Sequence, residues 1–152
     1  FSYPYGEYSL QIKELIKKKG FKAAFGQQSG IIFNEIDLFE LPRFSMNEKY
    51  GDIDRFKFAA NAKALSVKEI TPRNLIIENV NPPLMGFTLI NDIQSKISCY
   101  PSHNLKASIT KLSEKRIEIR FNNEFPKGRT RVNCTTNDNN KWRWFGLQFF
   151  RP

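Results

Sequence analysis

The sequence has few metal ligands and no long apolar run. It holds 152 residues but a single histidine, His103, which stands beside the turn residues of YPSHN and is expected on a surface loop. A zinc site needs three or four His, Cys or carboxylate ligands, so we expect no metal site in this chain alone. No run approaches eighteen consecutive apolar residues, and no secretory signal opens the chain, which does not begin with Met. We therefore expect no transmembrane segment in these residues. The missing signal indicates little, because a processed protein or a partial sequence would also begin without Met.

Cysteine is also scarce. Cys99 and Cys134 allow one disulfide at most, which is too few to indicate an oxidising compartment. They fall in separate expected strands without CxxC spacing, so a metal role is not expected. Both a cross-strand disulfide and two buried thiols fit this arrangement.

Several catalytic motifs are missing. There is no GxSxG elbow, no GxGxxG and no phosphate-binding loop. Cys99 and His103 are the sole Cys-His combination, and they stand four residues apart across a proline. Nucleophile-and-base catalysis within this chain is therefore excluded as a leading hypothesis.

Positive charge is abundant. Lys and Arg total 24 against 15 Asp and Glu, which gives a net charge of +9. This balance suits an anionic partner such as nucleic acid, a lipid surface or an anionic glycan. The charge is spread along the chain, however, and the block at 17–19 ends a predicted helix, where cations are favoured in any soluble protein. No nucleic-acid partner is expected.

The first third of the chain alternates helix and strand patterns. Residues 9–19 predict an amphipathic helix with Ser9 as N-cap, Ile12, Leu15 and Ile16 on its apolar face, and Gly20 after its last turn. Residues 21–25 then read as a short strand. The order of turn, helix and strand is typical of one repeat of an α/β barrel or layered sheet.

A second helix is expected from residue 53 to about residue 62. Asp52 would cap it, and Ile53, Phe56 and Ala60 would form its inner side. The stretch between the two helices is too polar and interrupted to be a single element.

After residue 64 the pattern changes to short runs of period two. These runs, separated by prolines and polar turns such as NDNN, are VKEI, GFTLI, SKISCY, LKASITKL, KRIEIRF, TRVNCT and KWRWFGLQFF. About seven such strands predict a compact antiparallel β-sandwich. We therefore divide the chain into residues 1–63, of α/β character, and residues 64–152, a β-sandwich domain.

The strand KWRWFGLQFF permits two interpretations. Arg and Trp side chains can stack on bases or sugar rings. Alternation favours a simpler packing, in which Trp142 and Trp144 fill the sandwich while Lys141 and Arg143 point to solvent. In the preceding run, a turn at 126–128 would lead into a strand with Arg129 and Arg131 on its outer face, and Asn133 begins a weak glycosylation pattern.

The opening turn, FSYPYG, carries an unusual concentration of aromatic residues. Pro4 fixes one backbone dihedral and Gly6 lets the chain bend sharply, so Tyr3, Tyr5 and Tyr8 would flank the opening of whatever the helix packs on. Peptide N–H groups at such a turn, just before a helix, can point at a developing oxyanion. A turn with packing aromatics is the alternative.

Four stretches together resemble the polysaccharide deacetylases, the NodB-homology carbohydrate esterases. FSYPYGEYS is similar to the third motif of that family, an Arg-x-Pro-Tyr-like turn at the end of a barrel strand, and KKKGFKAAFGQQSG resembles the helix and strand that follow. LPRFSMNEKYGDIDRF looks like the next segment in one branch, and FPKGRTRVNCTTNDNNKWRWFGLQF resembles a β-rich C-terminal extension of bacterial members. The four stretches are spread from residue 1 to residue 149, so the resemblance spans nearly the whole length of the chain.

The resemblance implies a deformed (β/α) barrel in which a divalent, zinc-like metal activates water against an acetyl group of a sugar polymer. It implies that the backbone N–H of Tyr5 is the oxyanion donor and that Tyr5 and Pro4 line the sugar groove. Tyr3 and Tyr8, which would flank the same turn, complete the expected set of substrate-binding residues. The family has Arg where this chain has Ser2, so Arg43 is the candidate for the orienting partner.

The metal-binding Asp and His motifs of the family lie upstream and have no counterpart here, and no residue matches its general acid. We therefore expect the chain to be the C-terminal part of a hydrolase whose metal-binding residues precede residue 1. Alone, the 152 residues would bind no metal and hydrolyse nothing. The full-length enzyme would act on an acetylated polysaccharide such as peptidoglycan, chitin or xylan. A periplasmic, secreted or cell-envelope location would suit such a substrate. The alternative is a non-catalytic carbohydrate-binding β-sandwich that uses Trp142, Trp144 or loop tyrosines.

Overall fold

The computed structural model describes residues 1–152 as a mixed α/β structure with more sheet than helix. Its helical elements are the short 3₁₀ helix η1 (Pro4–Gly6), α1 (Leu10–Lys18) and α2 (Ile53–Asn61). Its strands are β1 (Lys63–Ala64), β2 (Val67–Thr71), β3 (Met85–Leu89), β4 (Ser98–Pro101), β5 (Ala107–Lys111), β6 (Arg116–Phe121), β7 (Gly128–Asp138) and β8 (Lys141–Arg151). No helix has the length and apolar character that a membrane span requires.

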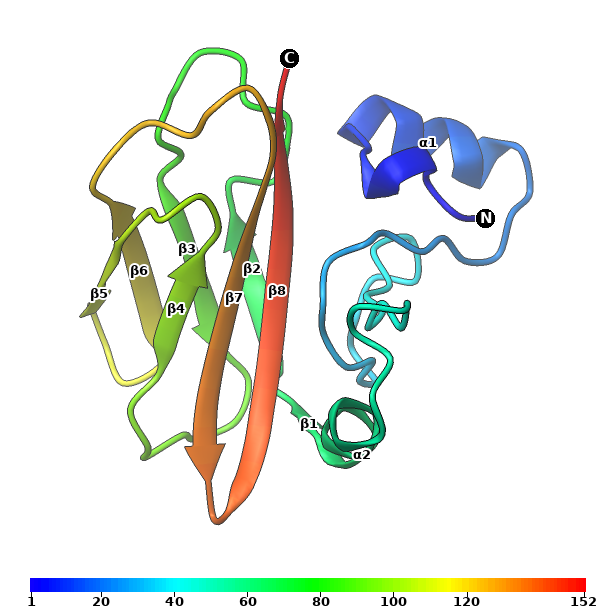
Figure 1. The fold of residues 1–152 in the computed structure, drawn as a ribbon. Coiled ribbons are helices and arrows are strands. Elements are labelled where there is room, and N and C mark those ends of the chain that lie inside the picture. Colours follow the sequence, from blue (N-terminus) through cyan, green and yellow to red (C-terminus); the bar gives the residue numbers. More distant parts are fainter.

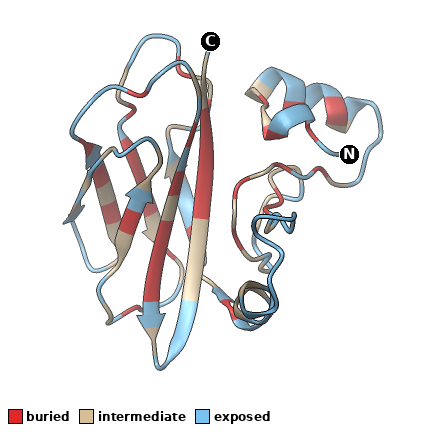
Figure 2. Cartoon of the chain, in the orientation of Figure 1, coloured by how far each residue is buried: buried red, intermediate tan, exposed pale blue.

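The strands form two four-stranded sheets. One has the order β1-β8-β7-β4 and the other β2-β3-β6-β5, and all pairs are antiparallel except β1 with β8. The sheets face each other in a sandwich-like arrangement, and the first sixty residues lie against the outer side of the β8 sheet (Figure 1). Buried side chains follow the facing strands (Figure 2) and include Phe87, Ile119, Phe125, Val132 and Phe149. The predicted sandwich is thus supported at the level of two packed, mostly antiparallel sheets.

All seven expected strands are present at their predicted places. The NDNN turn joins β7 to β8, with both Asn139 and Asn140 at positive φ (52° and 60°). Two central residues of this kind make a two-residue hairpin turn whose twist matches that of the strands. The turn thereby sets the register of an eleven-residue antiparallel pair.

Cys99 and Cys134 form a disulfide with an S–S distance of 2.04 Å. The two residues are direct partners across β4 and β7, with Cα atoms 4.0 Å apart. Of the two alternatives that the sequence leaves open, the cross-strand disulfide is therefore the one observed.

Both predicted helices form, with Ser9 and Asp52 as N-caps that accept from Ile12 N–H and Arg55 N–H. The predicted apolar face of α1 is wrong in part. Ile16 is buried, but Ile12 and Leu15 are 44% and 51% exposed, and Lys13 takes the inner position. The reason is a pair of carboxylates in the following loop, which neutralise the buried ammonium.

The predicted inner side of α2 is also wrong. Ile53 and Phe56 are 62% and 56% exposed, and Ala60 is exposed as well. The helix packs through Phe58, whose ring makes an edge contact with Trp144 at 5.8 Å between centroids. Apolar residues occur on both sides of this helix, so their spacing alone did not select the packed side.

The predicted facing of β8 is wrong. Phe145, Leu147 and Phe149 fill the space between the sheets, while Trp142 and Trp144 lie on the opposite face of the strand. Residues 28–62 cover part of that face, so both sides of β8 carry apolar side chains. When a strand is packed on both faces, the alternation of its residues cannot show which face points into the space between the sheets.

The charged residues of this hairpin divide differently from the prediction. Lys141 is exposed, as expected, but Arg143 is half-buried and pairs with Asp138 at 2.9 Å. Arg129 and Arg131 lie exposed on the outer face of β7, which confirms their prediction.

The N-terminal third holds three short extended stretches in parallel. Ser2 bridges Phe25, and Phe25 in turn bridges Leu41, both in parallel orientation. The pairing is made by backbone bonds such as Tyr3 N–H to Phe25 O at 3.0 Å and Gly26 N–H to Leu41 O at 2.9 Å. The first connection contains α1, so residues 1–26 follow a strand–helix–strand course. The predicted strand at 21–25 is reduced to one residue, Phe25, which bridges both neighbouring stretches.

Candidate functional site

The candidate site is built around the η1 turn. Tyr5 adopts φ 55° and ψ 7°, and Gly6 adopts φ 72°, so two consecutive residues lie in the left-handed region. A Cβ on Gly6 would stand 2.6 Å from Gln27, which explains why glycine is needed here. The backbone N–H of Tyr5 donates to no atom of the chain. The turn thus presents an unused peptide donor just before α1.

Side chains of strands β7 and β8 contact this turn. The buried Gln148 donates from Nε2 to the Tyr5 carbonyl oxygen at 2.9 Å, and its Oε1 accepts from Arg131 Nε at 3.1 Å. Arg129 lies 5.3 Å from the centroid of the Tyr5 ring and pairs with Glu7 at 3.4 Å. The sandwich therefore fixes the orientation of the turn through side chains of its outer face.

The four residues predicted to bind substrate separate into two pairs. Pro4 and Tyr5 are exposed, and Tyr5 is 67% accessible. Tyr3 and Tyr8 are buried, at 1% and 6% exposure, with their rings stacked at 4.4 Å between centroids. Only the exposed pair offers surface beside the unused N–H, whereas the buried pair supports the turn from within.

Burial also sets the ionisation of the two inner tyrosines. Desolvation, with the nearby carboxylates of Glu40 and Asp37, raises the pKa of Tyr3 to about 12. The Tyr3 hydroxyl donates to Phe39 O at 3.1 Å. Desolvation likewise raises the pKa of Tyr8 well above its ordinary value of 10.0. Both phenols therefore keep their protons further into the alkaline range than an exposed tyrosine does.

A buried ion cluster anchors α1 to the loop that follows. Lys13 is 2% exposed and its ammonium group contacts Asp37 at 3.0 Å and Glu40 more closely still. Burial works to raise the pKa of Asp37, but the Phe39 N–H and the Lys13 ammonium outweigh it and hold that pKa below 3.8. The cluster keeps the loop at 37–40 against the two buried tyrosines.

Arg43, the expected orienting partner, is exposed and makes no ion pair. Its backbone N–H donates to Gln28 O at 3.0 Å. No acidic side chain is therefore held by Arg43 in this structure, and its role stays a prediction.

His103 lies on a surface turn, as predicted, with its Nε2 2.8 Å from Arg129 O. No group of three or more His, Cys, Asp or Glu side chains is placed to hold a metal ion. The residues present thus do not fit a metal centre within this chain.

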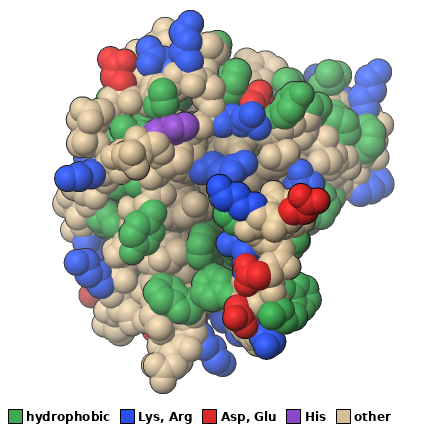
Figure 3. Space-filling view, viewed as in Figure 1, with side chains coloured by type: hydrophobic (Ala, Val, Ile, Leu, Met, Phe, Trp, Pro, Cys, Tyr) green, Lys and Arg blue, Asp and Glu red, His purple; other side chains and the backbone are tan.

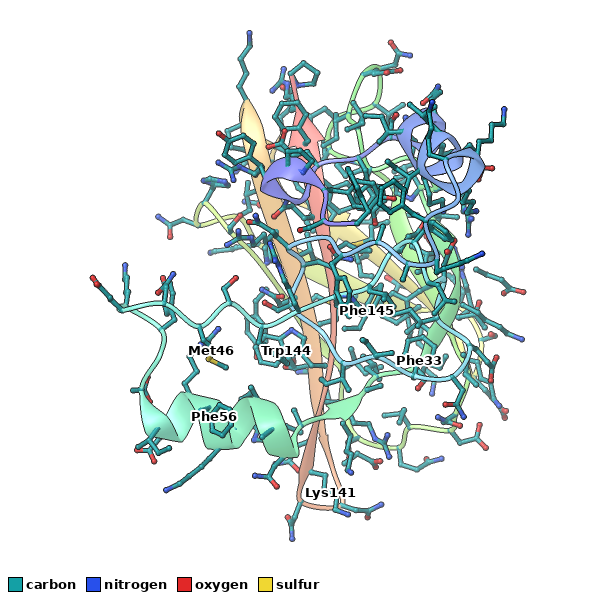
Figure 4. All side chains as sticks on the ribbon, turned by 90° about the vertical axis from the view of Figure 1, so that its right-hand side faces the viewer. Phe33, Met46, Phe56, Lys141, Trp144 and Phe145 are labelled. Carbon is teal, nitrogen blue, oxygen red and sulfur yellow. A yellow bond between two sulfur atoms is a disulfide. The ribbon has the colours of Figure 1, made fainter.

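A cavity of about 190 Å³ lies between the loop at 28–42 and the edges of β2 and β8. Figure 4 labels three aromatic side chains of its wall, Phe33 from the loop and Trp144 and Phe145 from β8. Tyr8 also lines it, as do several acidic and basic side chains. The sequence analysis did not anticipate this cavity, because its wall joins residues more than a hundred positions apart.

Two further residues of the site were missed for the same reason. Gln148 stands in an apolar run, where nothing in the sequence links it to the opening turn. Lys13 occupies an ordinary helical position, and only the fold brings carboxylates to it.

Comparison of the chain with protein-family models, with curated proteins and with solved structures finds no match. The resemblance to polysaccharide deacetylases therefore stays a prediction.

Proposed function

We propose that this chain is the C-terminal part of a metal-dependent polysaccharide deacetylase, a hydrolase that removes acetyl groups from an N-acetylated glycan. The observation that carries the proposal is the Tyr5 turn, which combines an unused backbone N–H, positive φ at two residues and an exposed aromatic ring. It follows a parallel extended stretch and precedes a helix, as the expected motif requires.

The chemistry of this chain in the reaction is oxyanion stabilisation. When water attacks an acetyl carbonyl, negative charge develops on the carbonyl oxygen, and the Tyr5 N–H would donate a hydrogen bond to it. The exposed Tyr5 ring and Pro4 would line the sugar groove beside that oxygen. A zinc-like metal would activate the water in the full-length enzyme, held by residues other than these 152.

The distribution of exposed apolar side chains supports a larger barrel around the N-terminal third. Twelve of the seventeen large hydrophobic residues that are exposed lie within residues 1–56, including Phe1, Ile12, Leu15 and Phe21. Figure 3 shows hydrophobic side chains gathered on the surface of that part. Such a concentration is typical of an interaction surface. We infer that residues 1–63 are the last α/β units of a barrel and that 64–152 form a β-sandwich packed on it.

The test is acetate release from an N-acetylglucosamine oligomer by the natural full-length protein with added zinc. Gly6→Ala would place a Cβ against Gln27 and displace the turn, so we expect kcat to fall by about 100-fold or more. Gly20→Ala is the matched control, because Gly20 also has positive φ (85°) but open space around it. It should cost about 1 kcal/mol of stability and leave kcat unchanged.

A well-folded full-length protein that releases no acetate would contradict the proposal. Equal effects of the two glycine substitutions on kcat would remove the Tyr5 turn from the mechanism.

One observation favours the alternative of a non-catalytic sugar-binding sandwich. Trp142 is 44% exposed near the tip of the β7–β8 hairpin, where its ring could stack on a sugar. In a Trp144→Phe chain, Trp142 is the sole tryptophan, and a change in its emission on adding the oligomer would favour this alternative.

A further inference from the structure

The cavity between the loop at 28–42 and strands β2 and β8 is separate from the exposed surface of the Tyr5 turn. Its walls are mainly apolar and come from both halves of the chain. The apolar lining includes Phe33 and Ile36 from the loop, Val67 from β2, and Trp144, Phe145 and Leu147 from β8. A largely preformed apolar pocket with a few polar groups is the usual form of a small-molecule site.

Tyr8 supplies a polar group that nothing in the chain uses. The side chain is 6% exposed and lines the cavity, and its hydroxyl makes no hydrogen bond within the protein. Its stacking partner Tyr3, by contrast, donates to Phe39 O. The Tyr8 hydroxyl is not among the fully buried unpaired polar atoms of the chain, so it faces accessible space and is free to bond a ligand in the cavity.

The remaining polar groups indicate the charge of that occupant. Lys68 and Arg73 line the cavity together with four carboxylates, those of Glu35, Asp37, Glu40 and Glu69. Asp37 and Glu40 share the ammonium group of Lys13, whereas Glu35 and Glu69 make no ion pair. This balance does not select an anion, although the chain as a whole is at +9. Carboxylates accept hydrogen bonds from hydroxyl groups, and aromatic rings cover apolar ring faces.

We propose that this cavity binds one neutral, hydroxyl-rich sugar ring. A cavity of about 190 Å³ suits a small ligand such as one pyranose unit. The ring would lie against Trp144 and Phe33, with a hydroxyl bonded to Tyr8 and others to the carboxylates at the mouth. The choice of a sugar rests on the proposed function; the site would then retain a unit of the glycan away from the Tyr5 turn.

The experiment uses the 152-residue chain with Trp142→Phe, so that Trp144 in the cavity wall is the sole tryptophan. Titration with N-acetylglucosamine should change the Trp144 emission in a saturable way. Tyr8→Phe removes only the unpaired hydroxyl and should weaken binding about three- to tenfold, as expected for one neutral hydrogen bond. Tyr100→Phe, at a tyrosine that is 61% exposed, is the matched control and should not change the affinity.

Stability separates a binding role of Tyr8 from a structural one. Because the hydroxyl has no partner in the free chain, Tyr8→Phe should leave the melting temperature unchanged or raise it. A lower melting temperature with unchanged affinity would overturn the proposal. Glu35→Gln offers a second variant at an exposed position, with Glu48→Gln as its control outside the cavity; only the first should weaken binding.

The outcomes distinguish this proposal from the deacetylase function. If the emission of Trp144 does not change on adding the sugar, the proposed sugar site in the cavity is wrong, even if the full-length protein releases acetate. A response of Trp144 that Tyr8→Phe weakens would support the site even if no acetate is released.

Discussion

Lys13 is the sole buried lysine of the chain, and its position depends on two carboxylates from one loop. A buried ion pair adds little over an apolar packing, but removal of one partner leaves the other charges unpaired in a poorly solvated place. The cluster therefore matters less for its own energy than for what happens when it is broken. It also explains why a charged side chain takes the inner face of α1 while two apolar ones face solvent.

We expect Lys13→Ala to lower the free energy of unfolding by about 3–5 kcal/mol, because Asp37 and Glu40 would then share a buried site without a cation. Urea denaturation followed by circular dichroism would measure it. Lys18→Ala, on the exposed side of the same helix and outside any ion pair, should change stability by less than about 0.5 kcal/mol. Similar losses in the two variants would contradict this account of the cluster.

For helices and strands, the sequence predicts which elements form better than it predicts which side of each element is buried. The strands after residue 64 follow from period-two runs bounded by turn residues, and the caps Ser9 and Asp52 mark both helix starts. Facing fails where an element has apolar residues on two sides, as in β8 and α2. In both cases the buried side is decided by residues far away in the chain.

The candidate site shows the same division. The Tyr5 turn can be predicted from the sequence, because Pro4 and Gly6 are turn-forming residues next to Tyr5. The Gln148 contact and the partner of Lys13 are not, because each joins segments that only the complete fold brings together. Sequence patterns therefore locate the turn that carries the Tyr5 N–H, but they do not locate the distant residues that orient this turn.

The disulfide gives a prediction for β4 and β7. It joins two strands across a sequence separation of 35 residues, and β4 has no partner strand in its sheet other than β7. In the chain-entropy model, a loop of this length corresponds to about 4 kcal/mol of stabilisation. We expect the double variant Cys99→Ala and Cys134→Ala to lose about 2–4 kcal/mol in urea denaturation. Reductant should lower the stability of the parent chain and leave the variant unaffected; a parent insensitive to reductant would contradict the expectation.

At the scale of the whole molecule, titratable groups in both halves make stability depend on pH at both extremes. On the acid side, burial is outweighed by the Phe39 N–H and Lys13 at Asp37, and by Arg116 and Arg120 at Glu118, so that both carboxyl pKa values are lowered. The unfolded chain therefore binds more protons than the folded one near and below pH 4. Stability gained above the ordinary values of 3.8 and 4.5 should be lost as pH falls through the lower folded values.

The alkaline side has the opposite sign, because burial raises the pKa of Tyr3 to about 12 and that of Tyr8 well above 10.0. Above pH 10 the unfolded chain loses phenolic protons that the folded chain keeps, so the free energy of unfolding should fall with rising pH. Urea denaturation at intervals from pH 8 to pH 12 would measure the fall. Tyr3→Phe should make this fall less steep, because the variant lacks the phenol that titrates at position 3. Tyr100→Phe, at an exposed position, should leave the fall unchanged. An unchanged slope in Tyr3→Phe would mean that other groups produce the alkaline loss and that the tyrosine pair does not couple its burial to folding.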